Sequence, residues 1–293
     1  MKDKYNVVFE RFPTIDKLIQ ANKNRKPNKV FSPYSLKSND TSDECQSFSE
    51  TASYQEAEDL LVHSWDKPLD RLKGGEKAFV KSNTVAQKRK SATGVVGYMP
   101  NVPNAVMGLP NSMINTESIK RKVKAVTIVY SPCVSYQWSS NEIIDSGIAV
   151  MNIINLLERN GIRVQLTIEF MASHTGISNP KNQLSVAWLN VKGWRDPLDL
   201  KKIAFPVVHS SMLRRIGFRW LETNPNITNQ SYTRGYGMPI GDGIYTAAVR
   251  TLNDHQLLKD HEYYITAPLC RDMNFDPEKI MEKANMMNLR KGA

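Results

Sequence analysis

Hydroxyl, imidazole and carboxylate side chains follow four of the strands that the sequence predicts. They lie in the loops 131–140, 173–183, 193–196 and 270–272, and they are Ser131, Ser135, Ser139, Ser140, His174, Asp196 and Asp272. In an open parallel sheet, ligands bind beyond the carboxyl ends of the strands, where such loops meet. At that edge Asp196, Asp272 and His174 would suit a metal-dependent nuclease or hydrolase, with Mg²⁺ held by oxygen ligands.

Three further motifs lack a feature that their chemistry requires. The loop YSPCVSYQWSSNE is similar to the D-x-S-x-S metal loop of a von Willebrand factor A domain, but Tyr130 and Ser131 stand where the aspartate would be. Its hydroxyls are therefore expected to cap the next helix.

His255 and His261 are six residues apart, whereas helical zinc ligands are four apart. RGYGMPIGDG has no predicted strand before it, as a phosphate loop would, and His209, in an apolar helix, is expected to be a core residue.

Nearly all of the positive charge lies in one segment. The formal net charge is +10, and residues 67–124 hold twelve basic side chains against three acidic ones. Cations bind phosphates without a fixed spacing, and Tyr98 would add a stacking surface for bases. The residues predicted to bind nucleic acid are Lys81, Lys88, Arg89, Lys90, Tyr98, Lys120, Arg121, Lys122 and Lys124. A solvated basic face without a ligand is the competing interpretation.

Hydrophobic patterning predicts an α/β fold that would position these residues. β-branched apolar runs predict strands at 122–131, 162–170, 184–191 and 262–269. Capping residues and apolar periodicity predict helices at 51–65, 139–161, 196–222 with a break at Pro206, and 276–287. Strands that alternate with helices indicate a mostly parallel sheet covered by helices. We expect a Rossmann-like fold, or a von Willebrand A-like fold with a degenerate metal site, after a helical and irregular N-terminal region.

The chain before this sheet is predicted to have two parts. Residues 1–47 are polar with little periodicity and are expected to form an N-terminal arm. Residues 48–115 contain a helix and then the uncharged stretch VGYMPNVPNAVMGLPNSMIN, in which three prolines preset extended turns. Because its apolar side chains are costly to leave in water, we expect this stretch to pack on the α/β domain formed by residues 116–293.

Composition excludes several classes of protein. Hydrophobic residues make up 41% and charged residues 23% of the chain, as in ordinary globular proteins. No window is apolar and long enough for a signal peptide or a membrane helix, so no membrane partner is expected. Cys45, Cys133 and Cys270 are odd in number and far apart, which argues against a disulfide framework and a zinc site and favours a reducing cytosol.

Three passages together resemble a known family. They are TASYQEAEDLLVHSWDKPLDRL, VVGYMPNVPNAVMGLPNSMIN and LDLKKIAFPVVHSSMLRRIGFRWLE, and the resemblance spans residues 48–238. The family is an uncharacterised one encoded by bacteriophages and prophages of low-GC bacteria, a domain of unknown function. The resemblance implies a phage gene product in the cytoplasm of the bacterial host or in the virion, and it implies no catalytic residue.

These observations favour a non-enzymatic phage protein that binds DNA or RNA through its basic segment on an α/β scaffold. The first alternative is a protein-interaction or assembly subunit of a phage particle or complex, with a protein partner or self-assembly. The second is the metal-dependent nuclease or hydrolase described above. No nucleophile elbow, Cys/His dyad or paired carboxylates support an enzyme, so no cofactor is expected, with Mg²⁺ as the alternative.

Overall fold

The computed structural model divides the chain into two compact units. One comprises residues 1–74 and 125–293, and the other comprises residues 75–124. The structure describes residues 6–29, 31, 36–65, 89–118, 124–135, 137–174, 183–227, 236, 245–259 and 262–286. We call the first unit the body and the second the inserted unit. This division differs from the predicted boundaries at 48 and 116, because the N-terminal residues belong to the body.

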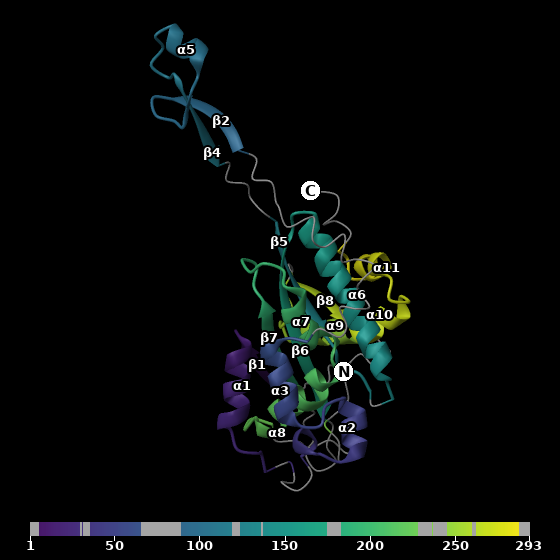
Figure 1. The fold of residues 1–293 in the computed structure, drawn as a ribbon. Helices are drawn as coiled ribbons and strands as arrows, with labels where there is room; N and C mark the ends of the chain where they lie inside the picture. The colour runs from purple at the N-terminus through teal and green to yellow at the C-terminus, as the bar shows by residue number, and fades with distance from the viewer. Residues whose placement is uncertain are drawn as a thin grey trace. The chain divides into compact units, whose positions relative to one another are not determined.

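A five-stranded mixed sheet forms the centre of the body (Figure 1). Its strands, in spatial order, are β1 (Asn6–Phe12), β7 (Gln183–Lys192), β6 (Arg163–His174), β5 (Ala125–Ser131) and β8 (Glu262–Thr266). β6 and β7 are antiparallel, whereas the other three neighbouring pairs are parallel. The predicted α/β class with mostly parallel strands is confirmed.

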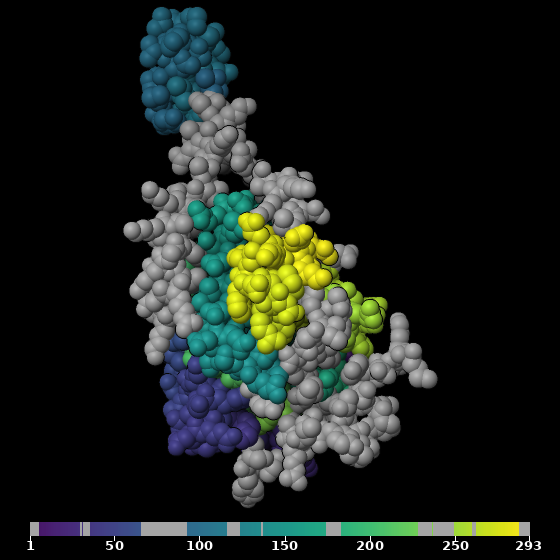
Figure 2. Space-filling view, turned by 90° about the vertical axis from the view of Figure 1, so that its right-hand side faces the viewer, coloured from purple at the N-terminus to yellow at the C-terminus, as the bar shows by residue number. Residues whose placement is uncertain are grey.

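Helix α6 (Ser140–Arg159) covers one face of this sheet, where the main hydrophobic core lies. Ser139 and Glu142 form a capping box at its start, as the sequence predicts for the hydroxyls of this loop. Gly161, at φ +75°, ends the helix in the left-handed region that glycine tolerates. Helix α7 (Leu200–Val208) packs beside α6, and α10 (Ala267–Asp272) and α11 (Pro277–Lys283) also contact α6 (Figure 2).

The other face of the sheet carries a second, smaller core. Alternate residues of the strands point to this side, and they pack with Leu252 of α9 (Tyr245–Asp254). The buried members of this core on the strands are Val129, Met171, Leu184, Val186, Trp188 and Tyr264. The sheet is therefore covered on both faces, which fits its largely apolar strands.

The N-terminal residues are part of the body and do not form the predicted polar arm. β1 pairs in parallel with β7 from Asn6↔Gln183 to Phe12↔Leu189, and Val8, Phe12 and Leu18 are buried. The elements that follow β1 are α1 (Ile15–Asn24), the 3-10 turn η2 (Lys37–Asn39), α2 (Asp43–Ser49) and α3 (Tyr54–His63). The prediction was wrong because few, widely spaced apolar side chains are enough to bury one face of an edge strand and one face of a short helix.

The helical region after α7 contains a π-helix. α7 continues through Pro206 to Val208, with His209 as its C-cap, so the predicted break at Pro206 is wrong. The next elements are the π-helix η4 (Met212–Gly217) and α8 (Phe218–Thr223). His209 is buried, stacks on Phe205 at 4.8 Å and meets the edge of Trp65 at 4.5 Å between ring centroids. The predicted assignment of His209 to the core is confirmed.

The inserted unit is a small three-stranded antiparallel sheet with one helical turn. Its strands have the order β2 (Arg89–Gly94), β4 (Met113–Ser118) and β3 (Met99–Pro100), and α5 (Val102–Val106) lies between β3 and β4. Gly97 permits close backbone approach, since a Cβ there would lie 2.3 Å from the carbonyl oxygen of Ile114. The stretch 96–115 is thus a folded element, and its packing on the body stays a prediction.

Candidate functional site

The carboxylates predicted for a nuclease do not converge. Because β7 runs against β5, β6 and β8, the loop after it lies at the opposite edge of the sheet. Trp194 in this loop donates to the carbonyl oxygen of Val126 near the start of β5, at 3.2 Å. Asp196 accepts from the Gly193 N–H at 2.7 Å and closes its own turn. Asp272 instead ends α10, which follows the carboxyl end of β8.

The remaining residues of the predicted edge site have structural positions. Ser131 is buried at the end of β5, and the Ser135 hydroxyl accepts from the Gln137 N–H at 3.3 Å. Ser139 caps α6 and Ser140 is its first residue. His174 is the last residue of β6, and its side chain lies outside the described part of the structure. Among the described residues, no group of three or more His, Cys, Asp or Glu side chains could hold a metal ion.

A fully buried carboxyl group lies beneath α9. Glu169 of β6 accepts from Trp188 Nε1 at 3.0 Å and from the Tyr264 hydroxyl. Burial raises the pKa of Glu169 because desolvation opposes its charge, and these two hydrogen bonds only partly offset that effect. Arg11 lies over the Trp188 ring at 5.0 Å. The cluster has neutral partners in a closed core, which favours a protonated structural carboxyl over a catalytic one.

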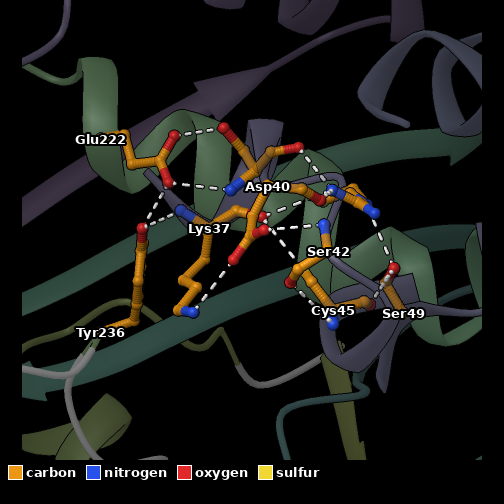
Figure 3. A network of polar contacts seen from close by, with 9 residues as sticks. Lys37, Asp40, Ser42, Cys45, Ser49, Glu222 and Tyr236 are labelled. Atoms are coloured by element: carbon orange, nitrogen blue, oxygen red, sulfur yellow. Dashed lines mark hydrogen bonds and ion pairs between the residues drawn. The ribbon is translucent and has the colours of Figure 1, made fainter. Parts of the chain in front are cut away.

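A second buried polar network joins the N-terminal residues to the π-helix (Figure 3). Arg215 is fully buried and donates to the carbonyl oxygens of Ser38, Asp40 and Thr51 at 3.1, 2.6 and 2.8 Å. Its Nε donates to the Ser49 hydroxyl at 3.1 Å. The guanidinium thus satisfies carbonyl groups that no helix or sheet would pair. The adjacent arginines of the apolar stretch MLRRIG were the signal in the sequence for this network, and the sequence reasoning missed it.

Two carboxyl groups, those of Asp40 and Glu222, flank this network (Figure 3), and their pKa values are shifted in opposite directions. Hydrogen bonds from the backbone N–H and hydroxyl of Ser42, with Lys37 Nζ at 3.1 Å, lower the pKa of Asp40 to about 2. Burial raises the pKa of Glu222, although its carboxylate accepts from the Ser38 N–H at 3.0 Å and from the Tyr236 hydroxyl. The network holds four chain segments together and leaves no described group aimed at a ligand.

A shallow groove of about 920 Å³ lies between α9 and α11. It includes Asp254, which precedes His255 in the chain, while His261 lies outside the described residues. The other lining residues are Val249, Arg250, Asn253, Met273, Lys279, Glu282, Lys283 and Asn285. Since both signs of charge alternate along it, its electrostatics select no class of ligand.

The inserted unit pairs the ends of two strands that adjoin the basic clusters in the sequence. β2 and β4 pair from Arg89↔Ser118 to Gly94↔Met113, so Arg89 and Ser118 are neighbours. Lys88 directly precedes Arg89, and Lys120 is two residues beyond Ser118, each residue adding ~3.8 Å of backbone. Lys124 and Tyr98 are exposed, Tyr98 at 66%. Lys81, Lys88, Lys120, Arg121 and Lys122 lie outside the described residues, as do the side chains of Arg89 and Lys90.

These features define an α/β protein with a mixed sheet and a small inserted β unit. The chain belongs to the family described as domain of unknown function (DUF7192), which matches residues 2–287. Comparison with curated proteins and with solved structures gives no match. Within the described residues, no helix is both long and apolar enough to cross a membrane.

Proposed function

We propose that the protein binds nucleic acid through the basic end of the inserted unit, with the body as its scaffold. The observation that carries this proposal is the antiparallel pairing of β2 with β4. It places Arg89 opposite Ser118, and the clusters Lys88–Lys90 and Lys120–Lys124 adjoin these two residues in the sequence. We call this end, at Arg89 and Ser118, the base of the inserted unit.

Charge supports a polyanionic ligand at the base. The unit from residue 75 to residue 124 holds nine basic and two acidic side chains. One of the acids, Glu117, is paired in register with Lys90. Clustered cations bind phosphates by releasing condensed counterions, without a fixed geometry. The separation of Asp196 from Asp272 removes the main support for a metal-dependent nuclease, so binding without catalysis is favoured.

The biological setting belongs to the same proposal. The resemblance to phage and prophage proteins supports a role in the bacterial cytoplasm or in the virion. The finer likeness to Rossmann or von Willebrand A folds rests on the order of β5, α6 and β6. Tyr130 and Ser131 stand at the position of the lost metal-binding aspartate, so that likeness supports a scaffold without metal chemistry.

The test is binding to labelled DNA and RNA as a function of salt. The variant K88E/R89E/K90E/R121E/K122E should lose binding, and the slope of log K against log salt should fall in magnitude by about 4 to 5. The matched control reverses five exposed cations of the body, Lys17, Lys26, Arg195, Lys202 and Lys259. It has the same net charge as the first variant. Equal loss in both variants, or in neither, would contradict a site at the base.

A further inference from the structure

The inserted unit exposes an apolar surface at the end opposite to its base. Eight exposed large apolar side chains lie between residues 95 and 109, and they are Val95, Val96, Tyr98, Met99, Val102, Val106, Met107 and Leu109. No residue from 91 to 116 is charged. We call residues 95–111 the apex. Exposed apolar patches of this kind mark interaction sites.

Hydrogen bonds give the apex a defined shape. The Tyr98 N–H donates to Ile114 O at 3.0 Å, and the Asn101 N–H donates to Ser112 O at 2.7 Å. The Leu109 N–H donates to Asn104 O at 2.9 Å. Between Met107 and Leu109 the chain turns through Gly108 at φ +70°, where a Cβ would meet nothing within 4 Å. Met107 and Leu109 therefore flank an open, outward turn.

Three possible occupants fit the apex poorly. A lipid interior is disfavoured because the amides of Asn101, Asn104 and Asn111 would lose hydration in hydrocarbon. A second copy would bring two strongly positive units together. A single nucleic-acid strand needs aromatic planes for its bases, and Tyr98 is the one exposed aromatic side chain among residues 93–115, whose side chains the structure describes.

Double-stranded DNA offers a groove for the apolar apex of the inserted unit and phosphates for the cations of its base. Proteins that enter the minor groove combine cations and amides with wedges of Leu, Met or Pro that unstack a base step and bend the duplex. The apex presents Met107, Leu109 and Pro110 next to the amide of Asn111. The six-residue strand β2 separates Arg89 from Gly94, next to the apex, by ~17 Å, so cations near Arg89 would meet phosphates on the flank of the duplex.

We propose that the apex enters the minor groove of double-stranded DNA, with Met107 and Leu109 as a wedge that bends it. This inference rests on the proposed function, because the cations of the base supply the phosphate contacts. It adds the class of nucleic acid and the part of the unit that deforms it.

The test measures DNA bending separately from binding. A duplex of about 30 base pairs carries a fluorescence energy-transfer pair at its ends. The wild-type protein should raise the transfer efficiency. M107S/L109S should bind with an affinity within about tenfold of wild type but should leave the duplex straight. The control V62S, at an exposed apolar position of α3 in the body, should still bend the DNA.

The possible results separate the two proposals. Binding without bending, or tighter binding to single-stranded DNA or to an RNA duplex, would overturn the wedge and leave the base as a binding site. Two results would identify a different occupant of the apex and would also overturn the wedge. One is binding of the protein to phosphatidylserine vesicles, and the other is self-association measured by light scattering, in each case abolished by M107S/L109S. Failure to bind any nucleic acid would end both proposals.

Discussion

Arg215 Nη1 lies 2.6 Å from the carbonyl oxygen of Asp40, which is 175 residues earlier in the chain. The same guanidinium contacts Ser38, Ser49 and Thr51, so one side chain of the π-helix fixes the path of the chain from η2 to the start of α3. An arginine that is saturated by carbonyl and hydroxyl oxygens has a structural role that no other side chain can reproduce.

Arg215→Ala should destabilise the protein severely. The substitution leaves several buried acceptors without a donor, and each unsatisfied group costs about 1–3 kcal/mol, so we expect a loss of roughly 3–5 kcal/mol in the free energy of unfolding. Arg215→Lys should recover only part of it. Urea denaturation followed by circular dichroism measures the loss. The exposed Arg159→Ala on α6 is the control, and an equal, small effect of both changes would contradict the assigned role.

Gly147→Ala should destabilise the protein although alanine favours helices. Gly147 lies in α6, where alanine would ordinarily add about 0.5–1 kcal/mol. A Cβ at this position would lie 2.6 Å from the carbonyl oxygen of Val207 and 2.8 Å from Val208 Cα. Because backbone atoms of α7 must move, the net change should be a loss of roughly 1–3 kcal/mol. Asn152→Ala on the same helix is the control in thermal unfolding, and a stabilised Gly147→Ala variant would refute the close packing.

Glu169→Gln should change how stability depends on pH. Burial raises the folded-state pKa of Glu169 above its ordinary value of 4.5. The folded protein therefore binds this proton more tightly than the unfolded protein does. This binding adds to the free energy of unfolding in full at pH values below the pKa of the unfolded state, and the contribution is lost as pH rises through the pKa of the folded state. The loss is at most ~1.4 kcal/mol per pH unit. Glu169→Gln should remove it, so its stability relative to wild type should rise from pH 4.5 upward in urea titrations.

Two features of that comparison isolate Glu169. Burial also raises the pKa of Glu222, but Glu222 is present in both proteins and cancels in the difference. Glu282→Gln, at an exposed position of α11, provides the control for a lost surface charge. Parallel curves for Glu169→Gln and wild type would show that the carboxyl group titrates normally in the folded state.

Lys192→Met should cost more alone than together with Glu158→Gln. Lys192 is buried, and its Nζ lies 2.7 Å from Glu158 Oε1 and 2.8 Å from the carbonyl oxygen of Val164. Removing the lysine leaves a largely buried carboxylate, and the described residues then give it one cation, the half-exposed Arg163. We therefore expect a loss of about 3 kcal/mol in the free energy of unfolding. The double variant Lys192→Met/Glu158→Gln should lose less free energy of unfolding than Lys192→Met alone, by about 1 kcal/mol or more. Arg163→Met is the surface control, with an expected cost below about 1 kcal/mol.

Strong local signals made the centre of the fold predictable from the sequence. Apolar periodicity and Gly161 predicted α6 to within two residues at each end, although its cap is Ser139 and not the expected Ser140 or Asn141. β5 and β7 are largely apolar, whereas β6 alternates polar and apolar residues from Arg163 to Phe170. Strands that are buried on both faces are rich in apolar residues, so the composition of such a segment already predicts a strand.

The direction of β7 was available in the sequence but was not used. Only eight residues separate His174 from Gln183, and a parallel crossover needs a dozen or more. A hairpin is therefore the shorter solution, and it sends Asp196 to the other edge. β1 was harder to find, because NVVFERF buries only Val8 and Phe12 and its partner strand lies far along the chain. Long-range pairing of this kind leaves no local pattern.

The paired ends of β2 and β4 have an evolutionary consequence. Arg89 and Ser118 are neighbours at the outer ends of these strands, so a short turn could replace the residues between them. Such a replacement would leave the sheet and helices of the body unchanged.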